Sequence, residues 1–298
     1  MKKIPPETEL TREQLQKKIN NVRRMMPILS KASRPPKVVY GTEKYINTPE
    51  GRIRTLAYNM DKPETLPLYI NMHGGGFTAG TPESDDAFMN SIAEKTNIKI
   101  LNIDYSLAPE HQFPKALNEC FAVAEYAVEH AVEFGIIPEK VAVGGHSAGG
   151  NLGAAICLKD AAEKKLDIAG LIIDYAPLDI YTDGYLKSQP KGAIPPKMSR
   201  IADQCYCHKK EDRKDPLVSP VFASVEQVKS FPPTLVITAA GDSLCEEGEK
   251  FKDLLLEAGV DVTFKRFNGK HGFTHYGGAE ADEAWLMMIG YLAERLCR

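Results

Sequence analysis

Short apolar runs alternate with stretches of helical spacing along most of the chain. Six of the runs have the length and the β-branched content of buried strands, and they occupy residues 68–72, 98–103, 141–143, 168–175, 235–239 and 262–267. The stretches with helical spacing include residues 116–134, 148–164, 246–258 and 279–298. Strand and helix alternating this often predict an α/β fold, a mostly parallel sheet with helices on both faces.

An antiparallel strand pair precedes this alternation. Residues 38–46 and 53–58 alternate apolar and polar side chains on either side of Pro49-Glu-Gly51, a sequence that favours a turn. We therefore expect these two strands to form one edge of the sheet.

The N-terminal region has the pattern of an amphipathic helix. Thr11-Arg-Glu-Gln14 has the form of a capping box. The apolar positions after it share one face at helical spacing, and they are Leu15, Ile19, Val22 and Met26. Pro27 and then Pro35-Pro36 are expected to end the helix. Its basic residues lie on the opposite face, so the helix needs an apolar surface on which to pack.

Residues 178–213 interrupt the strand and helix pattern. They contain Pro190, Pro195 and Pro196, several lysines and no clear strand, and the segment is long for a loop within a compact domain. Segments of this size are usually lids or binding elements at the ends of strands.

Length and composition are those of a large globular protein. With 298 residues, 43% hydrophobic and 26% charged, the chain is compatible with two domains or with one large α/β domain and an appendage. Collagen, coiled coil and wholesale disorder are excluded. The net charge of −3 conceals an asymmetry, because residues 1–37 carry ten Lys and Arg against three Glu, which is +7. Such an arm can bind nucleic acid or an anionic membrane, or it can be the solvated face of a helix.

The cysteines do not indicate a disulfide framework. Six of them are scattered along the chain, and the longest apolar run near the N-terminus, residues 25–29, is too short for a signal sequence or a membrane span. We therefore expect reduced thiols and a cytoplasmic protein. Cys205-Tyr-Cys207-His208 lacks a second ligand pair at suitable spacing, so no metal site is predicted there.

A serine motif follows the third of the apolar runs. Gly145-His-Ser147-Ala-Gly149 joins the strand at residues 141–143 to a predicted helix, which is the setting of a G-x-S-x-G nucleophile elbow. Only glycine fits two residues on either side of a serine in so sharp a turn. Ser147 is therefore expected to expose its hydroxyl at the top of the sheet as a nucleophile.

A glycine run supplies the matching oxyanion hole. His73 and three glycines directly follow the strand at residues 68–72. Without side chains, their backbone N–H groups can approach a substrate oxygen together with the N–H of Ala148. Each such donor contributes about 3 to 4 kcal/mol in the transition state.

A serine nucleophile needs a base and a carboxylate that orients the base. Of seven histidines, His271 is favoured because it stands just after the last predicted strand, with His275 as a weaker alternative. Asp242 is the first carboxylate after the strand at residues 235–239, although an aspartate there can also be an ordinary helix N-cap. The order Ser147, Asp242, His271 is the order of α/β-hydrolases.

With these motifs in order along most of its length, the chain resembles the hormone-sensitive-lipase family of α/β-hydrolases. The resemblance rests on His73-Gly-Gly-Gly-Phe77, Asp104-Tyr-Ser-Leu-Ala-Pro-Glu110, Gly145-His-Ser-Ala-Gly149-Gly150-Asn151, Asp215-Pro-Leu-Val-Ser-Pro220, Gly241-Asp-Ser-Leu with Glu247-Gly248, and His271-Gly-Phe273. It implies an eight-stranded, mostly parallel sheet with a helical cap. It also implies a catalytic triad of Ser147, Asp242 and His271, with oxyanion donors at Gly75, Gly76 and Ala148.

The family builds its cap from an N-terminal helix and an insertion after the sixth strand. By this resemblance, residues 1–37 and 178–213 form the cap, and residues 38–177 and 214–298 form the hydrolase core. A cap gives the apolar face of the N-terminal helix a partner, which disfavours nucleic-acid binding. One position departs from the family pattern, since His146 stands where the family usually has Asp. That side chain is expected to point away from the substrate.

The resemblance implies a carboxylesterase or lipase-like serine hydrolase that cleaves short- to medium-chain carboxylic esters without a metal or cofactor. The expected partner is a small-molecule ester, with no nucleic acid and no stable membrane insertion, and a homodimer is compatible with the family. Substrate-binding side chains are expected at Phe77, Tyr105, Leu244 and Phe273. Two alternatives stay open: an amide hydrolase, either formamidase or small peptidase, because Gly-His-Ser-Ala-Gly-Gly also occurs there, and a non-catalytic small-molecule-binding relative.

Overall fold

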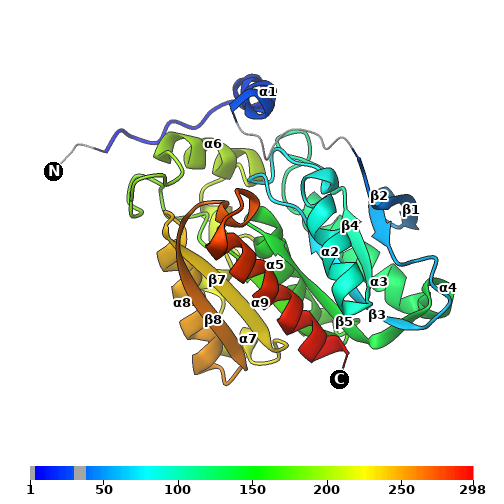
Figure 1. Cartoon of the computed structure of the whole chain (residues 1–298). Coiled ribbons are helices and arrows are strands. Elements are labelled where there is room, and N and C mark those ends of the chain that lie inside the picture. Colours follow the sequence, from blue (N-terminus) through cyan, green and yellow to red (C-terminus); the bar gives the residue numbers. More distant parts are fainter. Residues whose placement is uncertain (1–3, 30–37, 298) are drawn as a thin grey trace.

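The computed structural model describes residues 4–29 and 38–297, and its centre is an eight-stranded sheet (Figure 1). The strands lie in the order β1-β2-β4-β3-β5-β6-β7-β8. Their bounds are β1 Thr42–Thr48, β2 Gly51–Tyr58, β3 Leu66–Met72, β4 Lys99–Ile103, β5 Ile136–His146, β6 Ile168–Asp174, β7 Thr234–Gly241 and β8 Val262–Lys270. β1 pairs antiparallel with β2, and β2 with β4, whereas all other pairs are parallel. The predicted α/β class and the antiparallel edge are confirmed.

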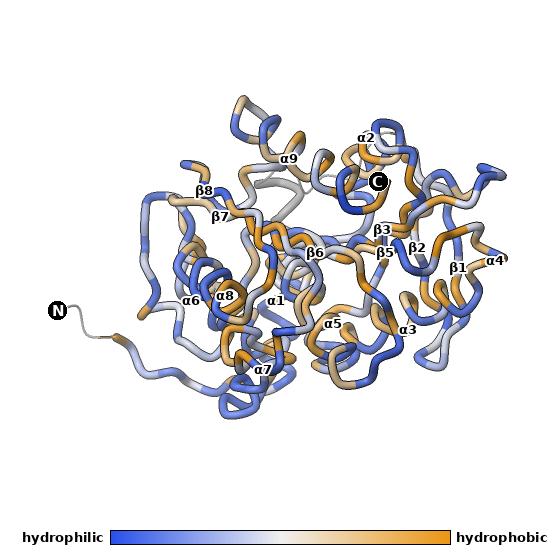
Figure 2. The backbone as a smooth tube through the Cα atoms, turned by 90° about the horizontal axis from the view of Figure 1, so that it is seen from below, coloured by the Kyte–Doolittle hydropathy of each residue, from blue (hydrophilic) through white to orange (hydrophobic). Residues whose placement is uncertain are grey.

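Helices cover both faces of the sheet, which Figure 2 shows from below as a middle layer between them. α2 (Asp86–Thr96) and α9 (Ala279–Leu296) bury their apolar sides with one face in a single cluster. The second cluster covers the other face with α3 (Lys115–Glu129), α5 (Ala148–Glu163) and α8 (Cys245–Glu257). Helices on both faces explain why β3 and β4 are almost wholly buried, since neither face of the sheet meets solvent there.

Some predicted bounds change in the structure. The stretch 116–134 is divided at His130 into α3 and α4 (Ala131–Phe134), and the strand predicted at residues 141–143 is the end of the longer β5. A single turn, α7 (Val225–Val228), precedes β7. None of the helices within the described ranges is both long enough and apolar enough to cross a membrane.

The N-terminal helix α1 (Arg12–Leu29) forms as predicted but extends further. Its capping box is present, with the Gln14 N–H donating to Thr11 Oγ1 over 3.3 Å and the Thr11 N–H donating to Gln14 Oε1 over 2.9 Å. The prediction that Pro27 ends the helix is wrong. Pro27 lies in the last turn, where its missing N–H removes one hydrogen bond and leaves the preceding turns intact. Pro35-Pro36 and the side chain of Met26 lie outside the described part of the chain.

The apolar face of α1 packs on the segment at residues 178–213, far away in sequence. That segment contains a helix, α6 (Pro196–Tyr206), which the proline-rich sequence obscured. Pro196 occupies the first helical position, where a proline costs no hydrogen bond. Leu15 and Ile19 of α1 form a small buried cluster with Ile201 of α6, together with Ala108 and Cys205.

Candidate active site

Ser147 stands between the last residue of β5 and the first residue of α5, in a strained turn. Its backbone has φ 51° and ψ −117°, a conformation that non-glycine residues rarely adopt. The two flanking glycines allow this turn to press against the end of β3. A Cβ added at Gly145 would lie 2.0 Å from the carbonyl oxygen of Met72, and one at Gly149 would lie 1.8 Å from it. No side chain fits either position.

Three side chains from separate strand ends meet at this turn. Ser147 Oγ lies 3.1 Å from His271 Nε2, and His271 Nδ1 lies 2.7 Å from Asp242 Oδ2. Asp242 follows β7 and is 1% exposed, while Ser147 is 7% exposed. Asp242 does not cap α8, which begins three residues later after Leu244. Its other oxygen, Oδ1, accepts the N–H of Leu244 over 3.1 Å, so both oxygens of the carboxylate are engaged.

The glycine loop after β3 lies directly against the serine turn. A Cβ at Gly74 would be 3.6 Å from that of Ser147, and Gly75 and Gly76 have φ values of 130° and 60°. The carbonyl of Gly75 accepts the N–H groups of Thr78 and Ala79, which curls the loop back on itself. Within the described ranges, no backbone acceptor pairs with the N–H of Gly75 or Gly76. The N–H of Ala148, at the first position of α5, has no acceptor within its own helix.

The four predicted substrate-binding side chains are all nearly buried around this loop. Phe77 stacks on Tyr206 of α6 with ring centroids 3.7 Å apart. Tyr105 stacks on His73 at 4.2 Å and donates its hydroxyl hydrogen bond to the His73 carbonyl over 2.8 Å. Tyr105 therefore supports the glycine loop from behind.

Leu244 and Phe273 lie on the other side of the site, next to its carboxylate and its imidazole. Leu244 immediately precedes α8, two residues after Asp242. Phe273 contacts Phe267 and Tyr175 at ring-centroid distances of 5.2 and 6.0 Å.

Both α1 and α6 reach the glycine loop from above. A Cβ at Gly76 would lie 3.7 Å from that of Ala202 in α6. Arg23 of α1 donates from Nε to the Thr78 carbonyl over 2.6 Å and pairs with both carboxylate oxygens of Glu110 at 2.6 and 2.9 Å. The hydrogen bond from Arg23 lowers the pKa of Glu110 to about 2. One basic side chain of the N-terminal arm thus ties this arm to the core beside the glycine loop.

A buried charge cluster joins residues 178–213 to α8. Lys187 Nζ lies 2.5 Å from Glu247 Oε2, while Glu247 Oε1 accepts the N–H of Leu178 over 2.8 Å. Burial raises the pKa of Glu247 to about 7 and that of Asp203 in α6 to about 7. Burial alone would lower the pKa of Lys187, but the nearby carboxylates outweigh it and raise that pKa. Glu247 contacts the Lys187 ammonium group directly, which favours the ionised form of Glu247. We therefore assign the protonated carboxyl group of this cluster to Asp203.

His146 points into the interior behind Ser147. Its Nδ1 lies 2.7 Å from Asp174 Oδ2 at the end of β6. His275, the weaker candidate for the base, instead places Nε2 2.9 Å from Asp85 Oδ1, just before α2. Sequence reasoning missed Asp85 and Asp174; the one signal that could have led to them was the histidine at position 146.

The His/Cys pattern at residues 205–208 does not converge on a common point. Cys205 is buried in the small cluster under α1, Cys207 Sγ faces the Lys209 carbonyl, and His208 Nε2 lies 2.8 Å from the Leu10 carbonyl. Among the residues that the structure describes, one set of three has metal-compatible spacing, and it consists of Asp85, His146 and His275.

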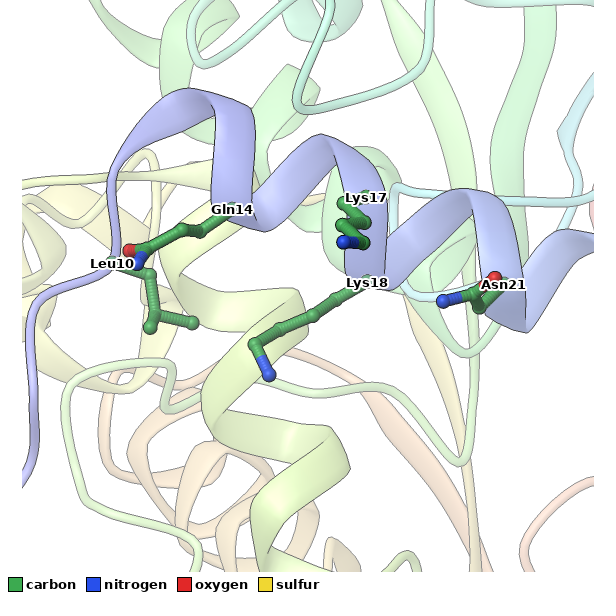
Figure 3. Close-up of a pocket in the computed structure, with 5 residues that line it drawn as sticks. All are labelled: Leu10, Gln14, Lys17, Lys18 and Asn21. Carbon is green, nitrogen blue, oxygen red and sulfur yellow. The ribbon is translucent and has the colours of Figure 1, made fainter.

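The two clearest surface clefts lie away from Ser147. Figure 3 shows the first, a groove of about 400 Å³ along α1 that is lined by Leu10, Gln14, Lys17, Lys18 and Asn21. The second lies between α2 and α9 and includes Phe88 and Trp285. Neither cleft is lined by Ser147, which is itself 7% exposed.

Comparisons with known proteins agree with this geometry. A family model described as alpha/beta hydrolase fold matches residues 69–275. The chain is 32% identical to the carboxylic ester hydrolase LipN of Mycobacterium tuberculosis, over 80% of this chain and 66% of that protein. It is 31% identical to an arylesterase of Saccharolobus solfataricus, over 79% of this chain and 76% of the relative.

Two further similarities concern the family as a whole. A segment of 100 residues is 44% identical to bovine hormone-sensitive lipase, which corresponds to 34% of this chain and 13% of that protein. Among solved structures, the carboxylesterase EstE1, cloned from a metagenomic library, superposes with a TM-score of 0.81 at 26% identity. That superposition covers 95% of this chain and 97% of EstE1.

The contact between the serine turn and Met72 predicts a strong effect of one methyl group. Gly149→Ala places a Cβ against the Met72 carbonyl and should destabilise the protein by at least about 2 kcal/mol. Gly290→Ala is the matched control, since nothing lies within 4 Å of its Cβ on the exposed side of α9; it should stabilise the protein by about 0.5 to 1 kcal/mol. Urea unfolding measures both, and equal stability of the two variants would contradict the close packing of the turn.

The charge cluster predicts a pH dependence that resides in Asp203. An unfolded aspartate titrates near 3.9 and folded Asp203 has a pKa of about 7, so between these two values only the folded protein holds the proton, and stability falls as the pH rises through that interval. Asp203→Asn should have a melting temperature close to that of the wild type at about pH 4, exceed it by a growing margin up to about pH 7, and keep that margin at higher pH. Asp167→Asn, at an exposed carboxylate, is the control. A wild type and Asp203→Asn that lose stability in parallel would refute the assignment.

Proposed function

The chain belongs to the hormone-sensitive-lipase-like family of alpha/beta hydrolases, and we propose on this basis that it is a serine carboxylesterase. The observation that carries the proposal is the contact chain from Ser147 Oγ through His271 to Asp242, at 3.1 and 2.7 Å. These distances are those at which a base can take a hydroxyl proton and a carboxylate can orient the base.

In the proposed reaction His271 Nε2 accepts the proton of Ser147 as the hydroxyl oxygen attacks the ester carbonyl. Asp242 holds Nδ1 and stabilises the imidazolium that forms. The N–H groups of Gly75, Gly76 and Ala148 stabilise the oxyanion of the tetrahedral intermediate. Collapse of that intermediate expels the alcohol, which takes its proton from His271. A water molecule activated by His271 then releases the carboxylic acid.

We propose that residues 1–37 and 178–213 form the cap over a core of residues 38–177 and 214–298. Support comes from the packing of α1 on α6, from the approach of Ala202 to Gly76, and from Arg23, which binds the Thr78 carbonyl. Within the described part of the arm, Lys17 and Arg24 are exposed, while the apolar face of α1 packs on α6 and on Ala108. This argues against a nucleic-acid-binding arm.

The proposed substrate is a small ester with a short to medium acyl chain. Support comes from the 7% exposure of Ser147 and from the near-complete burial of Phe77, Leu244 and Phe273, the apolar side chains that we assign to the acyl site. Tyr105 is proposed to hold the glycine loop rather than to contact the ester. We further propose that the enzyme uses no cofactor, acts in the cytoplasm, and forms a homodimer through β8 and α9.

The nucleophile is tested by chemical labelling. A fluorophosphonate should label the wild type stoichiometrically, and Ser147→Ala should lose both labelling and at least about 10⁴-fold of kcat. The substitution removes one oxygen, so the melting temperature should change little. Ser91→Ala on α2 is the control and should keep full activity. Labelling that persists in Ser147→Ala would show that another residue is the nucleophile. A wild type that shows neither labelling nor turnover would favour a non-catalytic binding protein.

The substrate class is tested with a series of p-nitrophenyl esters from acetyl to palmitoyl. We expect kcat/KM to peak at short or medium chains, because the buried side chains around Ser147 limit the length of the acyl group. A rise toward palmitoyl with interfacial activation would contradict this. Paired ester and anilide substrates of the same acyl group should favour the ester, and a preference for the anilide would indicate an amide hydrolase.

A further inference from the structure

Behind Ser147 lie two His–Asp pairs, buried His146 with Asp174 and partly buried His275 with Asp85. We propose that these four side chains form a positioning network that sets the distance between the nucleophile and its base. None of the four touches the reacting atoms, so the proposed role is to hold Ser147 and His271 in register. The inference rests on the proposed function, since it concerns the same reaction.

The first pair holds the nucleophile side of the site. The N–H of Ser147 donates to the main-chain carbonyl of Asp174 over 2.8 Å. The side chain of the same Asp174 holds His146, the residue before the serine, at 2.7 Å. Asp174 therefore makes two hydrogen bonds to the turn, one through its backbone carbonyl and one through its carboxylate. A shift of this residue would move Ser147 with it.

The second pair holds the loop that carries the base. His275 is four residues beyond His271 and lies 2.9 Å from Asp85, whose other oxygen accepts from Asn71 Nδ2 over 3.0 Å. The carbonyl of Thr274 in the same loop accepts the indole N–H of Trp285 over 3.0 Å. These contacts anchor the loop to the start of α2, to β3 and to α9.

Thr274 and Tyr175 connect the two pairs. Thr274 donates from Oγ1 to Asp174 Oδ2 over 3.2 Å, so one carboxylate oxygen binds both His146 and the loop of the base. The Tyr175 hydroxyl lies 3.0 Å from both Thr274 Oγ1 and His275 Nδ1. The ring of Tyr175 packs edge-on against the imidazole of His271 at a centroid distance of 5.1 Å. The path from Ser147 to His271 through these groups is continuous.

Charge balance explains why the network can be buried. Burial opposes the ionised form of Asp85, but the imidazoles of His146 and His275 hold its pKa well below the ordinary value. Burial alone would lower the pKa of His146, and the carboxylates of Asp85 and Asp174 outweigh it and raise that pKa. An unpaired charge in such a place is strongly destabilising. Burial also raises the pKa of Asp174, and the contact with His146 opposes that rise.

A metal ion is a weaker explanation of the same cluster. Asp85, His146 and His275 have the spacing of ligands, but His275 Nε2 and Asp85 Oδ1 already satisfy one another by direct contact. The second carboxylate, Asp174, uses its Oδ2 for His146 and Thr274. The direct contacts favour hydrogen-bonded pairs that hold two segments together.

The first variant removes the hydrogen bonds that connect the two pairs and leaves their charges unchanged. Thr274→Val removes the connecting hydroxyl with almost no change in volume and no change in charge. We expect kcat for the best ester to fall about 10-fold or more, because a small misplacement of reacting groups is costly in rate, while KM changes less than about 3-fold. The melting temperature should fall by only a few degrees. His130→Asn, a histidine at the end of α3 outside this network, is the control and should leave kcat unchanged.

Variants of His146 test the other end. His146→Asn keeps a donor toward Asp174 and loses the charge, whereas His146→Leu loses both, so kcat should fall more in the leucine variant. If both substitutions break the same hydrogen-bonded network, the double variant Thr274→Val with His146→Asn should have a kcat close to that of the slower single variant. The raised pKa of His146 also predicts that the stability advantage of the wild type over His146→Asn is present below pH 6.5 and shrinks as pH rises. The groups facing His146 are Asp85, Asp174, Tyr175 and His275.

Three results would overturn the inference. One is a full kcat in Thr274→Val, and another is a loss of stability in the His146 variants with kcat and KM intact, which would make the cluster purely structural. The third is a loss of activity on EDTA treatment that zinc restores, which would assign the cluster to a metal. A wild type that neither hydrolyses esters nor takes up the fluorophosphonate would instead refute the proposed function.

Discussion

The close contact between the serine turn and the end of β3 is the constraint on which the rest of the site depends. Gly145 and Gly149 bring the backbone against the Met72 carbonyl at a distance that no Cβ permits. The same contact places the glycine loop that follows Met72 beside Ser147, with a Cβ at Gly74 3.6 Å from that of the serine. The strained backbone of Ser147, with φ 51°, persists because contacts with the ends of β3 and β6 hold the turn in place.

The cover of the site follows from a different kind of interaction. α1 and α6 are far apart in the sequence, and neither can bury its apolar stripe alone. Together they enclose Leu15, Ile19 and Ile201. Charged groups then attach this pair to the core, through Arg23 beside the glycine loop and through Lys187 beside α8. In the described part of the arm, Arg23 thus attaches α1 to the core, whereas Lys17 and Arg24 are exposed.

Beneath the turn, the protein buries charges where most cores are apolar. Asp174 binds the turn through its carbonyl and binds His146 through its carboxylate. Asp85 and His275 repeat the pairing on the side of the base. Buried ion pairs are poor sources of stability. Their presence beside the reacting groups is therefore better explained if they fix the positions of those groups. A directional hydrogen bond fixes an orientation in a way that apolar packing does not.

Sequence alone determined the order of strands and helices, the antiparallel edge, the capping box of α1 and the positions of Ser147, Asp242 and His271 at strand ends. These features are local, since periodicity, glycine spacing and the residue after a strand all lie within a few positions of one another. Local rules failed at Pro27 and at α6, because Pro27 lies in the last turn of α1 and Pro196 at the first position of α6, where a proline interrupts little of the helix. Only the tertiary structure decided the pairing of His275 with Asp85, 190 residues apart, and of His146 with Asp174. Such pairs depend on which strand ends and loops the sheet brings together, and no local pattern along the chain encodes that distance.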